Sequence, residues 1–251
     1  MKRISVPVRI MILVSCLSIV TASPSASQIN LKVGGGLGLM MSAGDLHGST
    51  TDYYAGTNYG LGNGINLQGK AKLGLIGFNL TGEIDYASLS NSGNSEPGKG
   101  SVELSQKILS FKVGPEFRFG LPMVPIVPYV GVNVALNKFS GETTLQGVAK
   151  VPSATYSMKN TSRIGIGFVG GVEVSAGPSL TLDFTLAYNL MNASGKEWED
   201  VNPGVDQRLD TYLALNDDAD PLYAAGSDKH VVSNSRSIHS IVFTVSVLFG
   251  L

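Results

Sequence analysis

The end of the chain, residues 236–251, alternates between two kinds of side chain. From residue 241 onward, every second position is apolar: Ile241, Phe243, Val245, Val247, Phe249 and Leu251. The positions between them hold smaller and more mixed side chains: Val242, Thr244, Ser246, Leu248 and Gly250. Successive side chains of a β-strand point to opposite faces, so this stretch predicts a strand with one wholly apolar face.

The same period of two recurs in seven earlier segments, at residues 29–42, 64–75, 78–90, 102–119, 126–139, 163–175 and 180–191. No helical pattern is present that could cover so many apolar strand faces. Lipid can cover them instead. The pattern therefore predicts an all-β protein, an eight-stranded antiparallel up-and-down transmembrane β-barrel. A change of parity near Ile108 and Leu109 predicts a β-bulge in the fourth strand.

The connections between these segments alternate between long and short. The long ones are residues 43–63, 91–101, 141–160 and 192–235, and the short ones are 76–77, 120–125 and 176–179. Barrels of the bacterial outer membrane have short periplasmic turns and longer external loops. We therefore expect an outer-membrane location with both termini on the periplasmic side. Within the last loop, residues 203–215 predict a short helix capped by Asn202.

The first residues read as an export signal. Lys2 and Arg3 form a basic start, residues 10–20 are an apolar run too short to span a bilayer, and small residues follow at 25–27. We expect a cleaved signal peptide over residues 1–27 and a barrel domain over residues 28–251.

Composition narrows the chemistry further. Charged residues make up 15% of the chain, against roughly 25% in an average soluble protein, and the net charge of −1 gives no reason to expect a nucleic-acid partner. Cys16 is the only cysteine. It follows a lipoprotein-like Leu13-Val14-Ser15, but this lies too early in the apolar run, so we expect no lipid on Cys16. The mature chain would then have no disulfide or thiol chemistry.

With its alternating segments and its C-terminal strand, the chain resembles the small outer-membrane β-barrel family, the OmpA- and OmpX-like eight-stranded barrels. The resemblance covers residues 28–251. It implies that the barrel assembly machinery reads the C-terminal strand, through Phe243, Val245, Val247, Phe249 and Leu251. In the family this signal usually ends in an aromatic residue, whereas here Phe249 lies two places before the final Leu251.

The strand faces expected to point inward carry charges of both signs: Lys32, Lys70, Lys72, Lys112 and Arg118, with Glu83, Asp85, Glu116, Glu173 and Asp183. An eight-stranded barrel is only wide enough to be filled by its own side chains, and buried charges must be paired. The sequence therefore predicts a salt-bridged lumen, with an ion or proton path as the alternative. A two-residue turn at 76–77 pairs Leu75 with Phe78 and sets Lys70 opposite Glu83.

Catalytic and metal motifs are weak. His239 lies on the outward parity beside Ser237 and Ser240, but the His-x-Ser arrangement of outer-membrane lipid A deacylases is absent, as are HExxH and GxSxG. Asp217-Asp218-Ala219-Asp220 lacks the spacing and the glycine of a calcium loop, which predicts a solvated acidic loop. We expect no catalytic residue, metal or cofactor.

Three functions remain open. The first is a monomeric, non-enzymatic outer-membrane barrel in contact with membrane lipid, with a structural or surface-interaction role through residues 192–235. The second is a narrow transporter of small apolar molecules, as in the OmpW-like family, which requires an apolar lumen. The third is a lipid-modifying enzyme, which requires a nucleophile and a base at the rim of the barrel.

Overall fold

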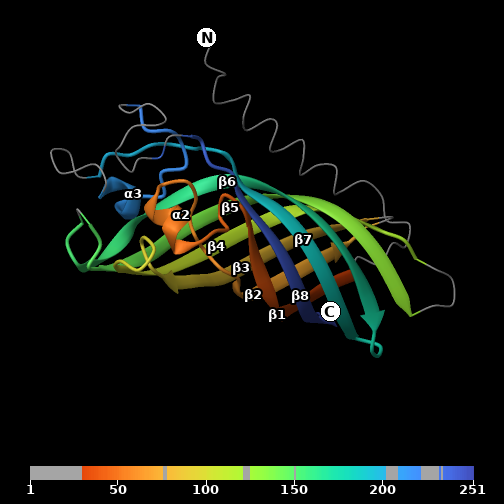
Figure 1. Cartoon of the computed structure of the whole chain (residues 1–251). Coiled ribbons are helices and arrows are strands. Elements are labelled where there is room, and N and C mark those ends of the chain that lie inside the picture. Colours follow the sequence, from red (N-terminus) through yellow and green to blue (C-terminus); the bar gives the residue numbers. More distant parts are fainter. Residues whose placement is uncertain are drawn as a thin grey trace, which may run out of the picture.

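Eight strands form one closed antiparallel barrel in chain order, as Figure 1 shows. The structure is a computed structural model that describes residues 30–75, 78–120, 125–149, 151–201, 209–221, 232 and 234–251. The elements are β1 (Asn30–Gly44), α2 (Thr50–Tyr54), β2 (Gly64–Gly74), β3 (Phe78–Gly93), β4 (Ser101–Arg118), β5 (Ile126–Gln146), β6 (Ala154–Ser175), β7 (Leu180–Ser194), α3 (Asp210–Leu213) and β8 (Ile238–Gly250). The expected eight-stranded up-and-down barrel is confirmed.

Two expectations fall wholly or partly beyond these described ranges. The signal peptide, residues 1–27, lies outside them, as do residues 203–208 of the expected helix. The helix α3 lies within the remaining part of that stretch. Among the described residues, no helix is long and apolar enough to cross a membrane.

The wall of the barrel separates apolar from polar side chains as the alternation predicts. Outward apolar side chains stay exposed, with Leu37 at 67% and Phe168 at 60%, whereas the inward Lys72 is 1% exposed. Contact between water and so many exposed apolar side chains is unfavourable, whereas contact with bilayer hydrocarbon is not. The barrel is therefore apolar on the outside and polar within.

The register between β2 and β3 is the predicted one. Lys70 pairs with Glu83, and the Leu75 amide donates to the Phe78 carbonyl at 2.8 Å. Residues 76–77 themselves lie outside the described ranges. The short connections gather at one end of the barrel, which we call the turn end, and the long connections, with α2 and α3, gather at the other, the loop end (Figure 1).

Two strands extend much further toward the loop end than predicted. β5 continues to Gln146 and β6 begins at Ala154, so most of residues 141–160 are strand and the expected polar loop is wrong. The polar side chains of this stretch misled the prediction because the outer faces of β5 and β6 are polar there, beyond the belt of exposed apolar side chains. The inner face remains buried, and Leu145 is fully covered.

The bulge expected near Ile108 is also wrong. β4 pairs with both neighbours without a shift at that point, and Ile108 points inward. The apparent change of parity has another origin, because the inward face changes from charged side chains to apolar ones along β4. The register shifts instead between Phe139 and Gly141 of β5, and between Ile164 and Ile166 of β6.

An apolar core fills the interior of the barrel at the loop end. The strands contribute Met40, Leu89, Val102, Leu104, Ile108, Phe139, Leu145 and Ile238, and the loops add Leu46, Tyr54, Tyr59, Leu61, Tyr212 and Leu215. All of these side chains are at most 5% exposed. The barrel thus has two interiors in series, a charged one between the lipid-facing walls and an apolar one beneath the loops.

Candidate functional site

The charged part of the lumen is centred on Lys72 of β2. Its Nζ lies 2.9 Å from Glu116 Oε2, 3.0 Å from Glu173 Oε1 and 3.0 Å from Asp183 Oδ2. The ammonium also stands 3.9 Å from the centroid of the Tyr129 ring. These partners come from four different strands, so one lysine joins opposite sides of the barrel.

Lys70, two residues earlier on the same inward face, extends the network toward β3. Its Nζ lies 2.9 Å from Glu83 Oε1 and 3.1 Å from Asp183 Oδ2. The Tyr129 hydroxyl donates to Asp183 Oδ1 at 2.6 Å. Asp183 is therefore held by two lysines and one phenol, and no part of it is exposed.

A second, smaller group lies beside Lys70. Lys112 Nζ is 2.8 Å from Asp85 Oδ2, and the amides of Asn66 and Gln68 each donate to Asp85 Oδ1 at 3.1 Å. The Ser246 hydroxyl of β8 then donates to Gln68 at 3.0 Å. Hydrogen bonds therefore connect this group on β2 with β8, past β1 that lies between them.

Near the turn end, Glu173 binds two further cations. Lys32 Nζ lies 2.6 Å from Glu173 Oε2, and Arg118 Nη2 lies 3.4 Å from the same oxygen. The Arg118 side chain is 33% exposed, which marks the approach to solvent. The structure thus brings together all ten charged residues expected in the lumen, and each has a partner of opposite sign. Buried ion pairs of this kind fill the space inside the barrel and connect its strands.

A buried polar cluster at the loop end was missed by the sequence reasoning. Arg163 of β6 forms a bidentate ion pair with Asp217, with Nε 3.0 Å from Oδ2 and Nη2 2.8 Å from Oδ1. Asp217 is 0% exposed and Asp220 is 4% exposed, so the expectation of a solvated acidic loop is wrong for both. Arg163, a charge on the inward parity at the start of the predicted strand 163–175, was the signal that a carboxylate partner was needed.

The bulge in the β6–β7 pairing places one member of this cluster, Asn192, inside the barrel. It buries the consecutive residues Met191 and Asn192, and the Asn192 amide donates to Asp217 Oδ2 at 2.8 Å. The Ile238 amide in turn donates to Asn192 Oδ1 at 2.8 Å. Asp217 therefore attaches the β7–β8 connection to the barrel rim on two sides.

Arg236 joins this connection to the loop between β1 and β2. Its guanidinium lies 4.7 Å from the centroid of the Tyr59 ring and donates to the Gly56 carbonyl at 2.9 Å. The Tyr59 hydroxyl donates to the Leu215 carbonyl at 2.9 Å. The described parts of two loops distant in sequence thus form one packed layer over the barrel.

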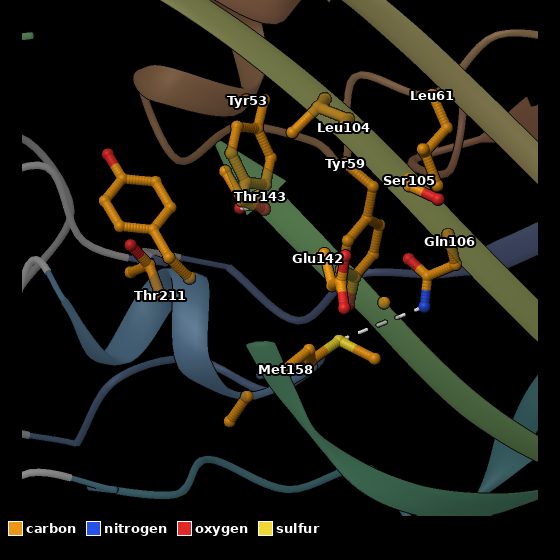
Figure 2. Close-up of a pocket in the computed structure, with 13 residues that line it drawn as sticks. Tyr53, Tyr59, Leu61, Leu104, Ser105, Gln106, Glu142, Thr143, Met158 and Thr211 are labelled. Atoms are coloured by element: carbon orange, nitrogen blue, oxygen red, sulfur yellow. Dashed lines mark hydrogen bonds between the residues drawn. The ribbon is translucent and has the colours of Figure 1, made fainter. Parts of the chain in front are cut away.

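A narrow recess opens between this layer and the inner faces of β4 and β5, and Figure 2 shows its lining. Tyr53 donates to or accepts from Thr143 at 2.7 Å, and its ring lies 5.4 Å from that of Tyr212. On the opposite side, the Gln106 amide reaches the Met158 sulfur at 3.9 Å. Burial raises the pKa of the Tyr53 and Tyr59 phenols, so both stay protonated at neutral pH. The recess has aromatic walls with a polar edge.

Among the residues that the structure describes, His239 is hydrogen-bonded to a tyrosine and not to Ser240. On the outer wall its Nδ1 lies 2.7 Å from the Tyr188 hydroxyl. Ser240 points into the barrel, is fully buried and accepts from the Asn189 amide at 3.2 Å. The two neighbours in sequence therefore face opposite sides of the wall. Within the described ranges, no group of three His, Cys, Asp or Glu residues is placed to hold a metal ion.

The C-terminal strand presents its expected apolar face to the outside. Phe243, Val245, Val247 and Phe249 are 44%, 37%, 38% and 53% exposed, and Leu251, which follows β8, is 78% exposed. On the other face, Val242, Thr244, Ser246 and Leu248 are buried. β8 closes the barrel by pairing with both β1 and β7.

Comparison with solved structures gives matches at low sequence identity. Neisserial surface protein A is 15% identical, with a TM-score of 0.49, over 87% of this chain and 96% of that chain. A major outer membrane protein of Thermus thermophilus is 14% identical (TM-score 0.47, 88% and 99% covered). Ail, the attachment invasion locus protein of Yersinia pestis, is 10% identical (TM-score 0.43, 89% and 99% covered).

No curated protein matches the sequence significantly. The family model of the outer membrane protein beta-barrel domain matches residues 12–208, most of the chain. This match agrees with the closed eight-stranded barrel, its apolar outer wall and its charged interior. The chain therefore belongs to the outer membrane protein beta-barrel family, whose small eight-stranded barrels it resembles.

Proposed function

We propose that this outer-membrane protein is a sealed barrel that conducts no solute and acts through the surface of its loop end. The observation that carries the proposal is the lumen centred on Lys72, where each of the ten charged side chains has an opposite partner. Moving an ion through it would require breaking buried pairs, each costing about 3–5 kcal/mol. The apolar loop-end core lies in series with this barrier and supports the same conclusion.

The loop end is the part that meets a partner in this proposal. Bacterial barrels expose their longer loops outside the cell, which would place both termini in the periplasm, since β1 begins and β8 ends at the turn end. The Arg163–Asp217 pair holds the described part of residues 192–235 against the rim. A pre-ordered surface loses less conformational entropy on binding than a mobile loop does. We assign any extracellular partner to this surface, and we assign recognition by the assembly machinery to the outward side chains of β8.

The rival functions fit the interior less well. A transporter of small apolar molecules needs an apolar path, whereas the lumen here contains Lys70, Lys72 and Lys112, all at most 8% exposed. A lipid-modifying enzyme needs a nucleophile near His239, whose partner is Tyr188. We therefore propose a non-enzymatic, monomeric protein surrounded by outer-membrane lipid.

Conductance in planar lipid bilayers tests the sealed lumen. The refolded protein, checked by its heat-dependent mobility in gels, should show no steady channel, while a general porin in the same bilayer should conduct. A stable open level comparable to that of the porin would contradict the proposal, because it would require a continuous water path past Lys72.

A further inference from the structure

A depression of about 490 Å³ interrupts the lipid-facing wall over β2, β3 and β4, which lie side by side in Figure 1. Its floor consists of Gly69, Ala71 and Gly82, and its rim includes Ile84, Phe111 and Val113. The strand register explains the shape, because Ala71 pairs with Gly82, and Gly82 pairs with Val113. Two neighbouring strands thus present their smallest side chains at one level.

The glycines of this floor are not required by the backbone. A Cβ placed on Gly82 would meet nothing within 4 Å, and one on Gly69 would meet only the Ile84 carbonyl, at 3.9 Å. By contrast, a Cβ on the lumen-facing Gly34 would lie 1.9 Å from the Val247 carbonyl. Close packing between strands therefore explains Gly34, but it leaves Gly69 and Gly82 without a structural requirement.

Two lysines stand on the outer wall between this depression and the loop end. Lys107 of β4 and Lys138 of β5 are both exposed and face outward. Lys107 pairs with Ser140, and Leu109 pairs with Lys138, so the two lysines are diagonal neighbours, with Cα atoms about 7–8 Å apart. Neither forms an ion pair with any residue that the structure describes.

Lys138 connects the lysine pair with the depression. Its Nζ lies 6.0 Å from the centroid of the Phe111 ring, which forms part of the rim. Phe111 is four residues from Lys107 along β4, or about 14 Å at the usual rise per residue. The nearest outward carboxylate toward the loop end is Glu142, which pairs with Ser105 and lies beyond ion-pair distance of both lysines. The wall thus changes from apolar to cationic to acidic along β4 and β5.

From this juxtaposition we propose that the wall formed by β2–β5 is a binding site for a phosphate-bearing membrane lipid. One acyl chain lies in the depression over Gly69, Ala71 and Gly82, and the phosphate binds between the ammonium groups of Lys107 and Lys138. Two neighbouring cations on the loop-end side of an apolar groove match a ligand with a phosphate at the interface and a chain below it. The site is independent of what the loop end binds and of whether the lumen is sealed.

Native mass spectrometry of the intact barrel, released from detergent micelles containing lipid A, tests the proposal. The wild-type protein should retain lipid A, and the Lys107→Gln/Lys138→Gln variant should retain at least tenfold less. Lys99→Gln is the matched control, because Lys99 is an exposed lysine in the connection between β3 and β4 and pairs with Glu96. Equal retention by the double variant and the control would overturn the proposal.

A second variant separates the groove from the charges. Gly82→Leu fills the depression in open space, so folding should be unchanged while retention of lipid A falls. Dephosphorylated lipid A should bind the wild type as weakly as lipid A binds the lysine variant. Displacement by millimolar inorganic phosphate would instead identify a free-anion site, and a dimer that Gly82→Leu abolishes would identify a second copy as the occupant. Either result would refute the lipid assignment.

Discussion

Replacing Lys72 by Met is expected to destabilise the barrel more than the same replacement at Lys112. Both lysines are buried in the lumen, at 1% and 8% exposure, so the substitutions are matched in type and burial. They differ in what they leave behind. Lys112 is paired with one carboxylate, Asp85, whereas Lys72 lies within 3.0 Å of three.

The magnitudes follow from the remaining partners. A contact at 3.0 Å in a medium of effective dielectric constant about 20 has a gross Coulomb energy of about 5–6 kcal/mol. Removing one member of a buried pair costs about 3–5 kcal/mol net. After loss of Lys112, Asp85 still accepts from Asn66 and Gln68, so we expect the lower end of this range.

After loss of Lys72, its three carboxylate partners differ in whether another cation remains within ion-pair distance. Asp183 keeps Lys70 and Glu173 keeps Lys32. Glu116 keeps no cation within 4.0 Å among the described residues. We therefore expect Lys72→Met to lower the free energy of unfolding by about 5 kcal/mol or more. The main reason is that Glu116 is left buried without a cation.

Urea titration of the folded fraction in lipid vesicles, read by gel mobility without heating, measures both variants. Adding Glu116→Gln to Lys72→Met removes the stranded charge and should recover about 0.5–3 kcal/mol, the usual coupling between residues in contact. Glu116→Gln alone serves as the reference for this cycle. If Lys112→Met costs as much as Lys72→Met, or if Glu116→Gln brings no recovery, the reasoning from partner number is wrong.

Three further outcomes are expected. Glu83→Lys should impair folding into lipid, and adding Lys70→Glu should restore only part of the loss, because Lys70 also contacts Asp183. The same urea titration measures both variants, and a double variant no more stable than the single one would contradict this. Asp217→Ala should leave the barrel folded but speed proteolysis of the β7–β8 connection, since Arg163 loses its bidentate partner. An unchanged cleavage rate would show that the Arg163–Asp217 pair does not hold this connection. Mass spectrometry of the mature protein should give an N-terminus near Gln28, and a lipidated Cys16 would refute this.

The barrel itself could be predicted because its rule is local. A period of two over eight segments assigns each side chain to lipid or lumen, and hairpin geometry then fixes the pairing of Lys70 with Glu83. The set of ten lumen charges follows from parity alone. The particular pairs do not, because Lys72 meets Glu173 across the barrel, 101 residues away, and strand tilt rather than hairpin register decides which charges meet.

Outside the lipid-facing belt the same rule gave wrong answers. At Ile108 the inward face becomes apolar, and a pattern analysis that expects polar inward residues interprets this as a slip in register. The Asp217 cluster was beyond reach for a related reason. It depends on a bulge that buries both Met191 and Asn192. The alternation of polar and apolar residues in β7 does not predict the additional residues of this bulge.

The cross-barrel pairs have a consequence for the order of folding. Lys32, Lys70 and Lys72 lie near the beginning of the barrel, and their partners Glu173 and Asp183 lie on β6 and β7, 141 residues away for Lys32 and 113 for Lys70. A sheet that has inserted only its first five strands holds these lysines without those carboxylates. The network is therefore satisfied only when β8 joins β1, which makes closure a cooperative step with high contact order and a slow one. A stalled intermediate of five strands would carry uncompensated positive charge on β1 and β4, because, among the described residues, Lys32 and Arg118 pair only with Glu173 of β6.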